Sequence, residues 1–223
     1  MSAPGWLYTL SLACSSLVMV AMVLVASLGW RRWRLLDNGG RWIVRAVVVM
    51  TVFSAVMLVM VIRGPDTTTV EALEWLAGGL LLLAGFAEWQ ATSRGRRLVL
   101  AAAVAYAVFW FALELSTHRT GPFHPILGPV RAMVVVGAAG VTLISRVKTT
   151  YGRWTGELWF WSCAAFMLIF GTEVVLDPLL DSTNGVRQDL SIAAFAFHQA
   201  VTLVAYLMIA RSLWQTKVPA VLA

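Results

Sequence analysis

Seven long apolar runs divide the chain, and they constrain its fold more than any other feature. Each run is about 20 residues or longer, enough for a helix that rises 1.5 Å per residue to cross ~30 Å of hydrocarbon. The runs are continuous and do not alternate between apolar and polar residues, so membrane-spanning strands are not expected. Helices are expected at about 5–30, 43–63, 70–90, 97–117, 125–146, 154–180 and 188–214.

The composition agrees with a lipid environment. Hydrophobic residues make up 60% of the chain and charged residues only 13%, which is more apolar surface than a soluble domain of this size can bury. The apolar runs are joined by short polar connectors. The sequence therefore predicts an all-α, polytopic integral membrane protein: a single domain over residues 1–223, with seven transmembrane helices and no soluble domain.

Positive charge is distributed unevenly among the connectors. The net charge of +6 comes from short clusters between apolar runs, which does not favour a nucleic-acid partner. If the N-terminus is outside, thirteen Lys and Arg residues fall on the cytoplasmic side and three on the outer side. Because cytoplasmic loops are enriched in Lys and Arg, we expect an N-out, C-in protein of a prokaryotic inner (plasma) membrane.

Several ionisable residues lie inside the apolar runs, where they are costly and functional candidates by default. They share a similar depth in the half of the bundle expected to face outward, and we expect His198 to meet Glu74 or Glu173. Two interpretations remain open: a polar pocket for a ligand or a proton relay, or an ion pair of Arg131 that holds helices together. The proposed polar residues are Glu74, Glu114, Arg131, Glu173, His198 and Gln199.

Patterns typical of enzymes and metal sites do not occur. The three histidines lack the HxxxH and HExxH spacings of zinc ligands, and no serine is marked by a neighbouring base. Only one histidine lies within an apolar run, whereas di-haem ligation needs pairs. We therefore expect neither an enzyme nor a metal site, and the sequence does not identify a cofactor.

Two of the runs resemble helices of microbial rhodopsins. The third run, EALEWLAGGLLLL, is similar to the rhodopsin third helix, in which tryptophan and leucines follow a carboxylate. On this resemblance Glu74 takes the counterion position and Trp75 that of a retinal-packing tryptophan. The sixth run, FWSCAAFMLIFGTE, resembles the family's sixth helix, which gives Trp161 the second ring-packing position and makes Glu173 an outer proton-release glutamate. His198 then stands where rhodopsins usually carry an aspartate.

The sequence departs from the rhodopsin pattern at the residue that would bind the chromophore. Thr202 occupies the position of the retinal-binding lysine, and the only lysines, Lys148 and Lys217, fall in a connector and in the tail. Glu71 replaces the family arginine before the counterion, and Gly85 replaces the proton-donor carboxylate. No covalent retinal is expected.

The resemblance and the polar residues together favour a sensory or small apolar ligand-binding protein that acts through a partner. Its ligand-binding residues would be Glu74, Trp75, Trp161, His198 and Thr202. One alternative is an accessory transmembrane subunit of a respiratory or photosynthetic complex, and another is a proton or ion pathway. The expected partners are the lipid bilayer and other membrane chains or further copies of this chain.

Overall fold

The computed structural model describes residues 5–64, 67–117, 124–150, 154–183 and 188–216, and this part of the chain contains helices and no strands. Two short 3-10 helices, η1 (Trp33–Leu35) and η2 (Trp154–Gly156), accompany seven long helices. Each long helix contains a segment long and apolar enough to cross a membrane, which confirms the seven predicted apolar helices. They are α1 (Gly5–Arg31), α2 (Asn38–Arg63), α3 (Thr68–Glu88), α4 (Ser93–Thr117), α5 (His124–Thr149), α6 (Leu158–Thr183) and α7 (Gln188–Gln215).

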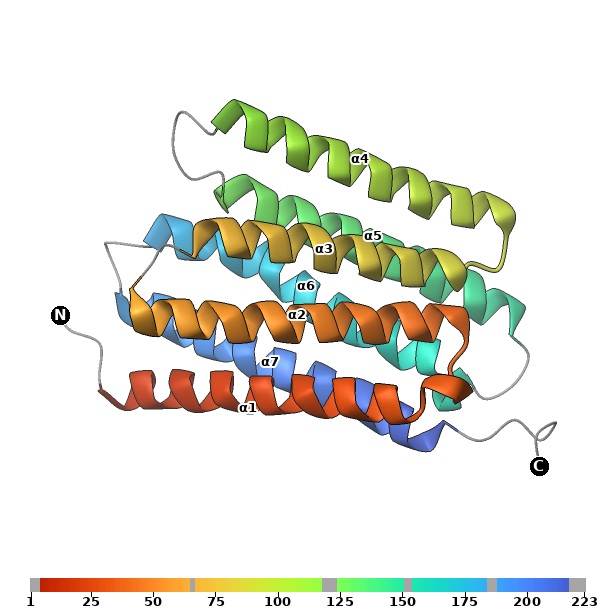
Figure 1. The fold of residues 1–223 in the computed structure, drawn as a ribbon, viewed down its shortest axis with the longest axis horizontal. Coiled ribbons are helices and arrows are strands. Elements are labelled where there is room, and N and C mark those ends of the chain that lie inside the picture. Colours follow the sequence, from red (N-terminus) through yellow and green to blue (C-terminus); the bar gives the residue numbers. More distant parts are fainter. Residues whose placement is uncertain (1–4, 65–66, 118–123, 151–153, 184–187, 217–223) are drawn as a thin grey trace.

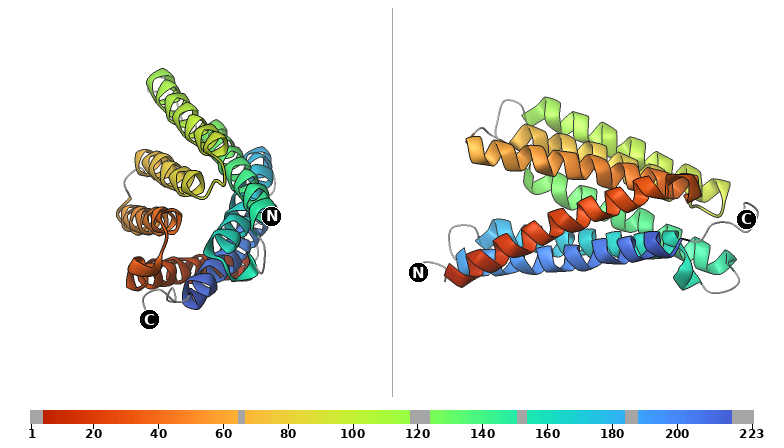
Figure 2. Two further views of the ribbon diagram at one scale, coloured as in Figure 1. Left: turned by 90° about the vertical axis from the view of Figure 1, so that its right-hand side faces the viewer. Right: turned by 60° about the horizontal axis from the view of Figure 1, so that its bottom comes forward.

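The helices form two facing rows, which the end-on view in Figure 2 shows most clearly. One row contains α1, α2 and α3, and the other contains α5, α6 and α7. At one edge α1 packs against α7, while at the other α3 packs against α5. Helix α4 packs on α3 and α5 and lies outside the two rows (Figure 1).

Aromatic rings fill part of the space between the rows. Phe86 of α3 meets Phe166 of α6 edge to face, with ring centroids 6.2 Å apart, and Phe166 stacks on Phe170 at the same distance. All three side chains are fully buried. Edge-to-face and offset-stacked rings stabilise such contacts beyond the area that they bury, so these residues fix α3 against α6.

Three helices begin four or more residues away from the starts that the apolar runs predict, and one of them, α4, begins at Ser93 rather than at residue 97. Helix α2 begins at Asn38 rather than near residue 43, because Asp37 caps it: the Asp37 carboxylate accepts a 2.7 Å hydrogen bond from the Gly40 backbone N–H. The first turn of α2 is polar and glycine-rich, so a search for apolar runs misses it. Helix α6 begins at Leu158 instead of residue 154, and η2 takes up the residues before it.

A second contact of Asp37 joins α2 to α3. The buried Trp89 donates a 2.9 Å hydrogen bond from its indole Nε1 to Asp37, and its carbonyl accepts from Arg146 Nε of α5. Gly39 lies against the Trp89 ring so closely that a Cβ there would be 2.6 Å from the indole Cε2. We call Asp37, Gly39, Trp89 and Arg146 the tryptophan joint.

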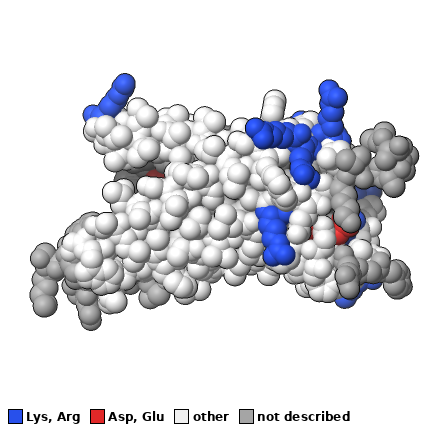
Figure 3. Space-filling view, turned by 90° about the horizontal axis from the view of Figure 1, so that it is seen from below, with Lys and Arg blue, Asp and Glu red and all other residues white. Residues whose placement is uncertain are grey.

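Charged side chains mark the same end of the bundle. Figure 3 shows Lys and Arg gathered toward the end at which α1 stops and α2 starts. Several come from the turn between these two helices, in which Arg31 and Arg34 are exposed. This asymmetry matches the uneven charge of the connectors in the sequence.

Candidate functional site

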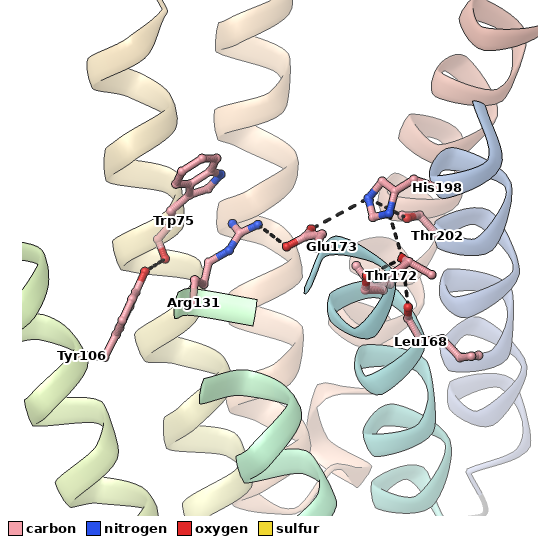
Figure 4. Close-up of polar contacts among 9 residues, drawn as sticks. Trp75, Tyr106, Arg131, Leu168, Thr172, Glu173, His198 and Thr202 are labelled. Atoms are coloured by element: carbon pink, nitrogen blue, oxygen red, sulfur yellow. Dashed lines mark hydrogen bonds and ion pairs between the residues drawn. The ribbon is translucent and has the colours of Figure 1, made fainter. Parts of the chain in front are cut away.

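Four ionisable side chains lie in the half of the bundle in which α3, α5 and α7 begin and α6 ends. We call them the charged cluster: Glu74 of α3, Arg131 of α5, Glu173 of α6 and His198 of α7. Each lies more than one turn inside its helix, in a stretch of mostly apolar residues. Figure 4 shows Arg131, Glu173 and His198 converging from separate helices.

Arg131 and Glu173 form a buried ion pair. Arg131 Nη2 lies 2.8 Å from Glu173 Oε2, and the two side chains are only 9% and 13% exposed. The guanidinium carbon of Arg131 lies 4.9 Å from the ring centre of Trp75 and 5.0 Å from that of Phe170. Such cation–π contacts help to hold the charge where water is excluded. The predicted pairing of Arg131 with one carboxylate is confirmed.

His198 extends the ion pair to α7. Its Nε2 lies 3.8 Å from Glu173 Oε1 and its Nδ1 lies 2.9 Å from Thr172 Oγ1. The prediction that His198 meets Glu74 or Glu173 is therefore confirmed for Glu173. Thr202, one turn along α7, brings its hydroxyl to 3.5 Å from Nε2.

The hydrogen bonds of Thr172 assign the proton on the His198 ring. A hydroxyl has one proton to donate, and the Thr172 hydroxyl donates it to the Ile169 carbonyl, 2.7 Å away in its own helix. His198 Nδ1 is then the donor to Thr172. In the neutral form of the ring, Nε2 is an acceptor that the Thr202 hydroxyl and the Glu173 carboxylate both approach.

Arg131 also has unused hydrogen-bonding capacity. Its Nε is buried and finds no partner within the described part of the chain. Buried donors are rarely left without an acceptor. The cluster therefore offers a donor at Arg131 Nε and, at His198 Nε2 and Glu173 Oε1, two acceptors that an incoming amine or ammonium group with at least two N–H protons could bridge.

Glu74 and its neighbours form the α3 side of the cluster. The Glu74 side chain is buried, and its carboxylate interacts electrostatically with the Arg131 guanidinium. Two aromatic side chains of α4 hold this part of α3: Tyr106 donates to the Trp75 carbonyl at 3.0 Å, and Trp110 Nε1 donates to the Ala72 carbonyl at 3.1 Å. These bonds fix the backbone that carries Glu74 and Trp75.

Trp161 does not join the cluster. It lies in the first turn of α6, where its indole donates a 2.7 Å hydrogen bond to the Thr155 carbonyl. Twelve residues separate it from Glu173, or about 18 Å along the helix. The expected pocket between Trp75 and Trp161 is corrected accordingly: Arg131, not Trp161, lies against Trp75.

The remaining predicted residues have less to contribute. Gln199 is half-buried, and its side chain makes no hydrogen bond with the part of the chain that the structure describes. The Glu114 side chain lies outside the described residues. Sequence reasoning missed Thr172, Phe170 and Tyr106; of these, only Phe170 carried a signal, because its i, i+3 spacing from Glu173 places both on one helix face.

Comparisons with known proteins leave the function to be inferred from this geometry. Searches against protein-family models, curated proteins and solved structures found no match for the chain.

Proposed function

We propose that the chain is an integral membrane protein, oriented N-out and C-in in a prokaryotic inner membrane, that binds a small polar or amphipathic molecule at the charged cluster. Binding would shift the packing of α5, α6 and α7, and a partner chain would detect the shift. The observation that carries this proposal is an unmet hydrogen-bond donor in a buried charged cluster: Arg131 Nε has no acceptor among the described residues, and it belongs to the side chain that pairs with Glu173, which lies 3.8 Å from His198 Nε2.

The chemistry of these groups defines the ligand. A protonated amine could donate one N–H to His198 Nε2 and another to Glu173 Oε1, while a carbonyl or carboxylate oxygen could accept from Arg131 Nε. Trp75 and Phe170 already contact the guanidinium, and they would supply apolar contact to the remainder of the molecule. Such a ligand is more polar than the apolar molecule expected from the sequence.

A distant relation to microbial rhodopsins is part of this proposal. The burial of Glu74 and the position of Trp75 beside a buried charge support it. The placement of Trp161 in the first turn of α6 counts against it, because no ring-shaped ligand could contact both tryptophans in the way the resemblance implies.

Native mass spectrometry of protein extracted gently from its own membranes tests the proposal. The wild-type chain is expected to carry a stoichiometric small molecule above its 24.4 kDa, and His198→Ala to lose it. Gln199→Ala is the matched control, because Gln199 is an adjacent, half-buried polar residue that makes no hydrogen bond within the described chain. A wild-type protein without any adduct, or equal loss from both variants, would contradict ligand binding at the cluster.

The position of α4 supports a second candidate, an accessory subunit. Only 17% of its most apolar segment is buried, the smallest share among the seven helices. Val104 and Val108 lie one turn apart on its exposed face. If the extracted protein carries other chains, and Val108→Trp releases them while the cluster variants do not, the subunit role is favoured. Proton flux into liposomes that disappears in Glu173→Gln would instead favour the ion pathway.

A further inference from the structure

Arginine and tryptophan side chains alternate in space where α1 turns into α2. The Trp33 ring of η1 lies 6.0 Å from the Arg41 guanidinium carbon and 5.2 Å from that of Arg45. Arg45 also lies 4.5 Å from the Trp42 ring, and Trp30 contacts Trp33 with centroids 5.9 Å apart. We call Trp30, Trp33, Arg41, Trp42 and Arg45 the arginine–tryptophan corner.

The backbone holds this corner in place. Gly29 lies so close to α2 that a Cβ there would be 2.7 Å from Val44 Cγ1, and only glycine permits this approach. Arg41 Nε donates to the Trp33 carbonyl at 3.3 Å, which ties η1 to the first turn of α2. The close approach of Gly29 to Val44 and the hydrogen bond from Arg41 to Trp33 therefore hold the aromatic rings and the guanidinium groups together.

The positive charge of the corner is not neutralised by an ion pair with any residue that the structure describes. Neither Arg41 nor Arg45 forms an ion pair within the described residues, whereas Arg96 and Arg131 each pair with a glutamate. The nearest acidic residue in the sequence, Asp37, instead accepts from the Gly40 N–H and the Trp89 indole. Unpaired arginines close to a membrane surface attract anions.

Arg45 lies between the charged residues of the corner and the exposed apolar face of α2. It is exposed although it lies seven residues into an apolar helix, about 10 Å from Asn38. Val52 and Val56, seven and eleven residues further on, share its face of α2 and are also exposed. A molecule that fits this surface needs an anionic head next to an apolar chain, which free phosphate does not provide.

We propose that the arginine–tryptophan corner binds the phosphate headgroup of an anionic membrane lipid, with an acyl chain lying along Val52 and Val56. The planar guanidinium groups of Arg41 and Arg45 match the geometry of phosphate oxygens. Trp30, which is 72% exposed, lies at the level where indole rings contact lipid headgroups. This site is separate from the charged cluster and does not depend on the function proposed for it.

The test is a lipid titration of the delipidated full chain, followed by native mass spectrometry, with dioleoyl phosphatidylglycerol and dioleoyl phosphatidylcholine as probes. We expect one phosphatidylglycerol to bind in preference to phosphatidylcholine. The double variant Arg41→Gln/Arg45→Gln should raise the apparent Kd for phosphatidylglycerol roughly 30-fold, about five-fold for each arginine. Arg94→Gln/Arg97→Gln is the matched control, since both arginines are exposed near the start of α4 and should leave the Kd unchanged.

Three results would overturn the proposal. Equal affinity for the two lipids would show that headgroup charge is not recognised, and an equal loss in the control variant would show only a general effect of net charge. Complete competition by millimolar inorganic phosphate would show an anion site without a role for the acyl chain. If the double variant does not fold, Arg45→Lys replaces it; this change keeps the charge, and an unchanged Kd there would exclude recognition by the planar guanidinium.

Discussion

The tryptophan joint and the charged cluster both connect helices through polar side chains, but they do so differently. In the joint, the Trp89 indole and the Arg146 guanidinium each have an oxygen partner, and one of the two partners is a backbone carbonyl. In the cluster, two charged side chains form an ion pair, and Arg131 retains a buried donor without a partner among the described residues. A satisfied network fixes one structure, whereas a partly satisfied one can change with a proton or a ligand. The joint is therefore suited to hold the bundle and the cluster to respond.

The largest effect is expected at the cluster. Glu173→Ala removes the hydrogen-bonded partner of the buried Arg131 and should lower the free energy of unfolding by about 3–5 kcal/mol, because the buried charge then keeps only its longer-range interaction with Glu74. Replacing both partners, as in Arg131→Met/Glu173→Leu, should restore most of that stability while removing the binding groups. Unfolding in mixed detergent–SDS micelles measures both. A double variant as unstable as Glu173→Ala would mean that packing, not charge, explains the loss.

At the joint, the expected effect comes from packing instead. Gly39→Ala places a methyl group against the Trp89 indole, and overpacking of this kind costs about 1–3 kcal/mol. The control is Gly137→Ala in α5, where an added Cβ meets nothing within 4 Å. Alanine favours helix over glycine by up to about 1 kcal/mol, so the control should be neutral or more stable in the same unfolding experiment. Equal stability of the two variants would contradict close packing at the joint.

Features that lie within a single helix could be predicted from the sequence. Features that depend on the contact between two helices were harder to predict. The apolar runs predicted all seven helices, and depth along them brought Glu173 and His198 to the same level. Trp161 was misplaced because the sequence motif carries no information on where α6 begins. Its first turn follows η2, and the Thr155 carbonyl takes the indole proton there.

The joint was missed altogether for a related reason. Asp37 and Trp89 are 52 residues apart, and each has an ordinary local explanation, as a helix cap and as an interfacial aromatic. Only the spatial approach of α2 to α3 at Gly39 makes them partners. An aspartate followed by two glycines before an apolar run was the available signal for a capped, closely packed helix start.

A smaller effect is expected next to the joint, where Gln90, which follows the C-cap of α3, is hydrogen-bonded to α5. The Thr142 hydroxyl is fully buried and accepts from Gln90 Nε2 at 2.5 Å. Thr142→Val keeps the shape and should cost about 0.6 kcal/mol, and at most about 1.7 kcal/mol, as hydrogen bonds between membrane helices do. Thr51→Val should cost less, because that hydroxyl bonds to Val47 of its own helix. A larger loss from Thr51→Val would contradict the role of the bond between helices.

The smallest effect is expected at the ion pair of Arg96 and Glu88. Arg96 Nη2 lies 2.6 Å from Glu88 Oε1, which is shorter than the 2.8 Å between Arg131 Nη2 and Glu173 Oε2. The Arg96 side chain, however, is 54% exposed. Exposed pairs contribute about 0–1 kcal/mol, so Arg96→Ala should change the free energy of unfolding by less than about 1 kcal/mol, and less still at high salt. The two pairs differ in burial and hardly in geometry. A cost for Arg96→Ala as large as that for Glu173→Ala would show that burial is not what distinguishes the cluster, and the reason for assigning it a responsive role would be lost.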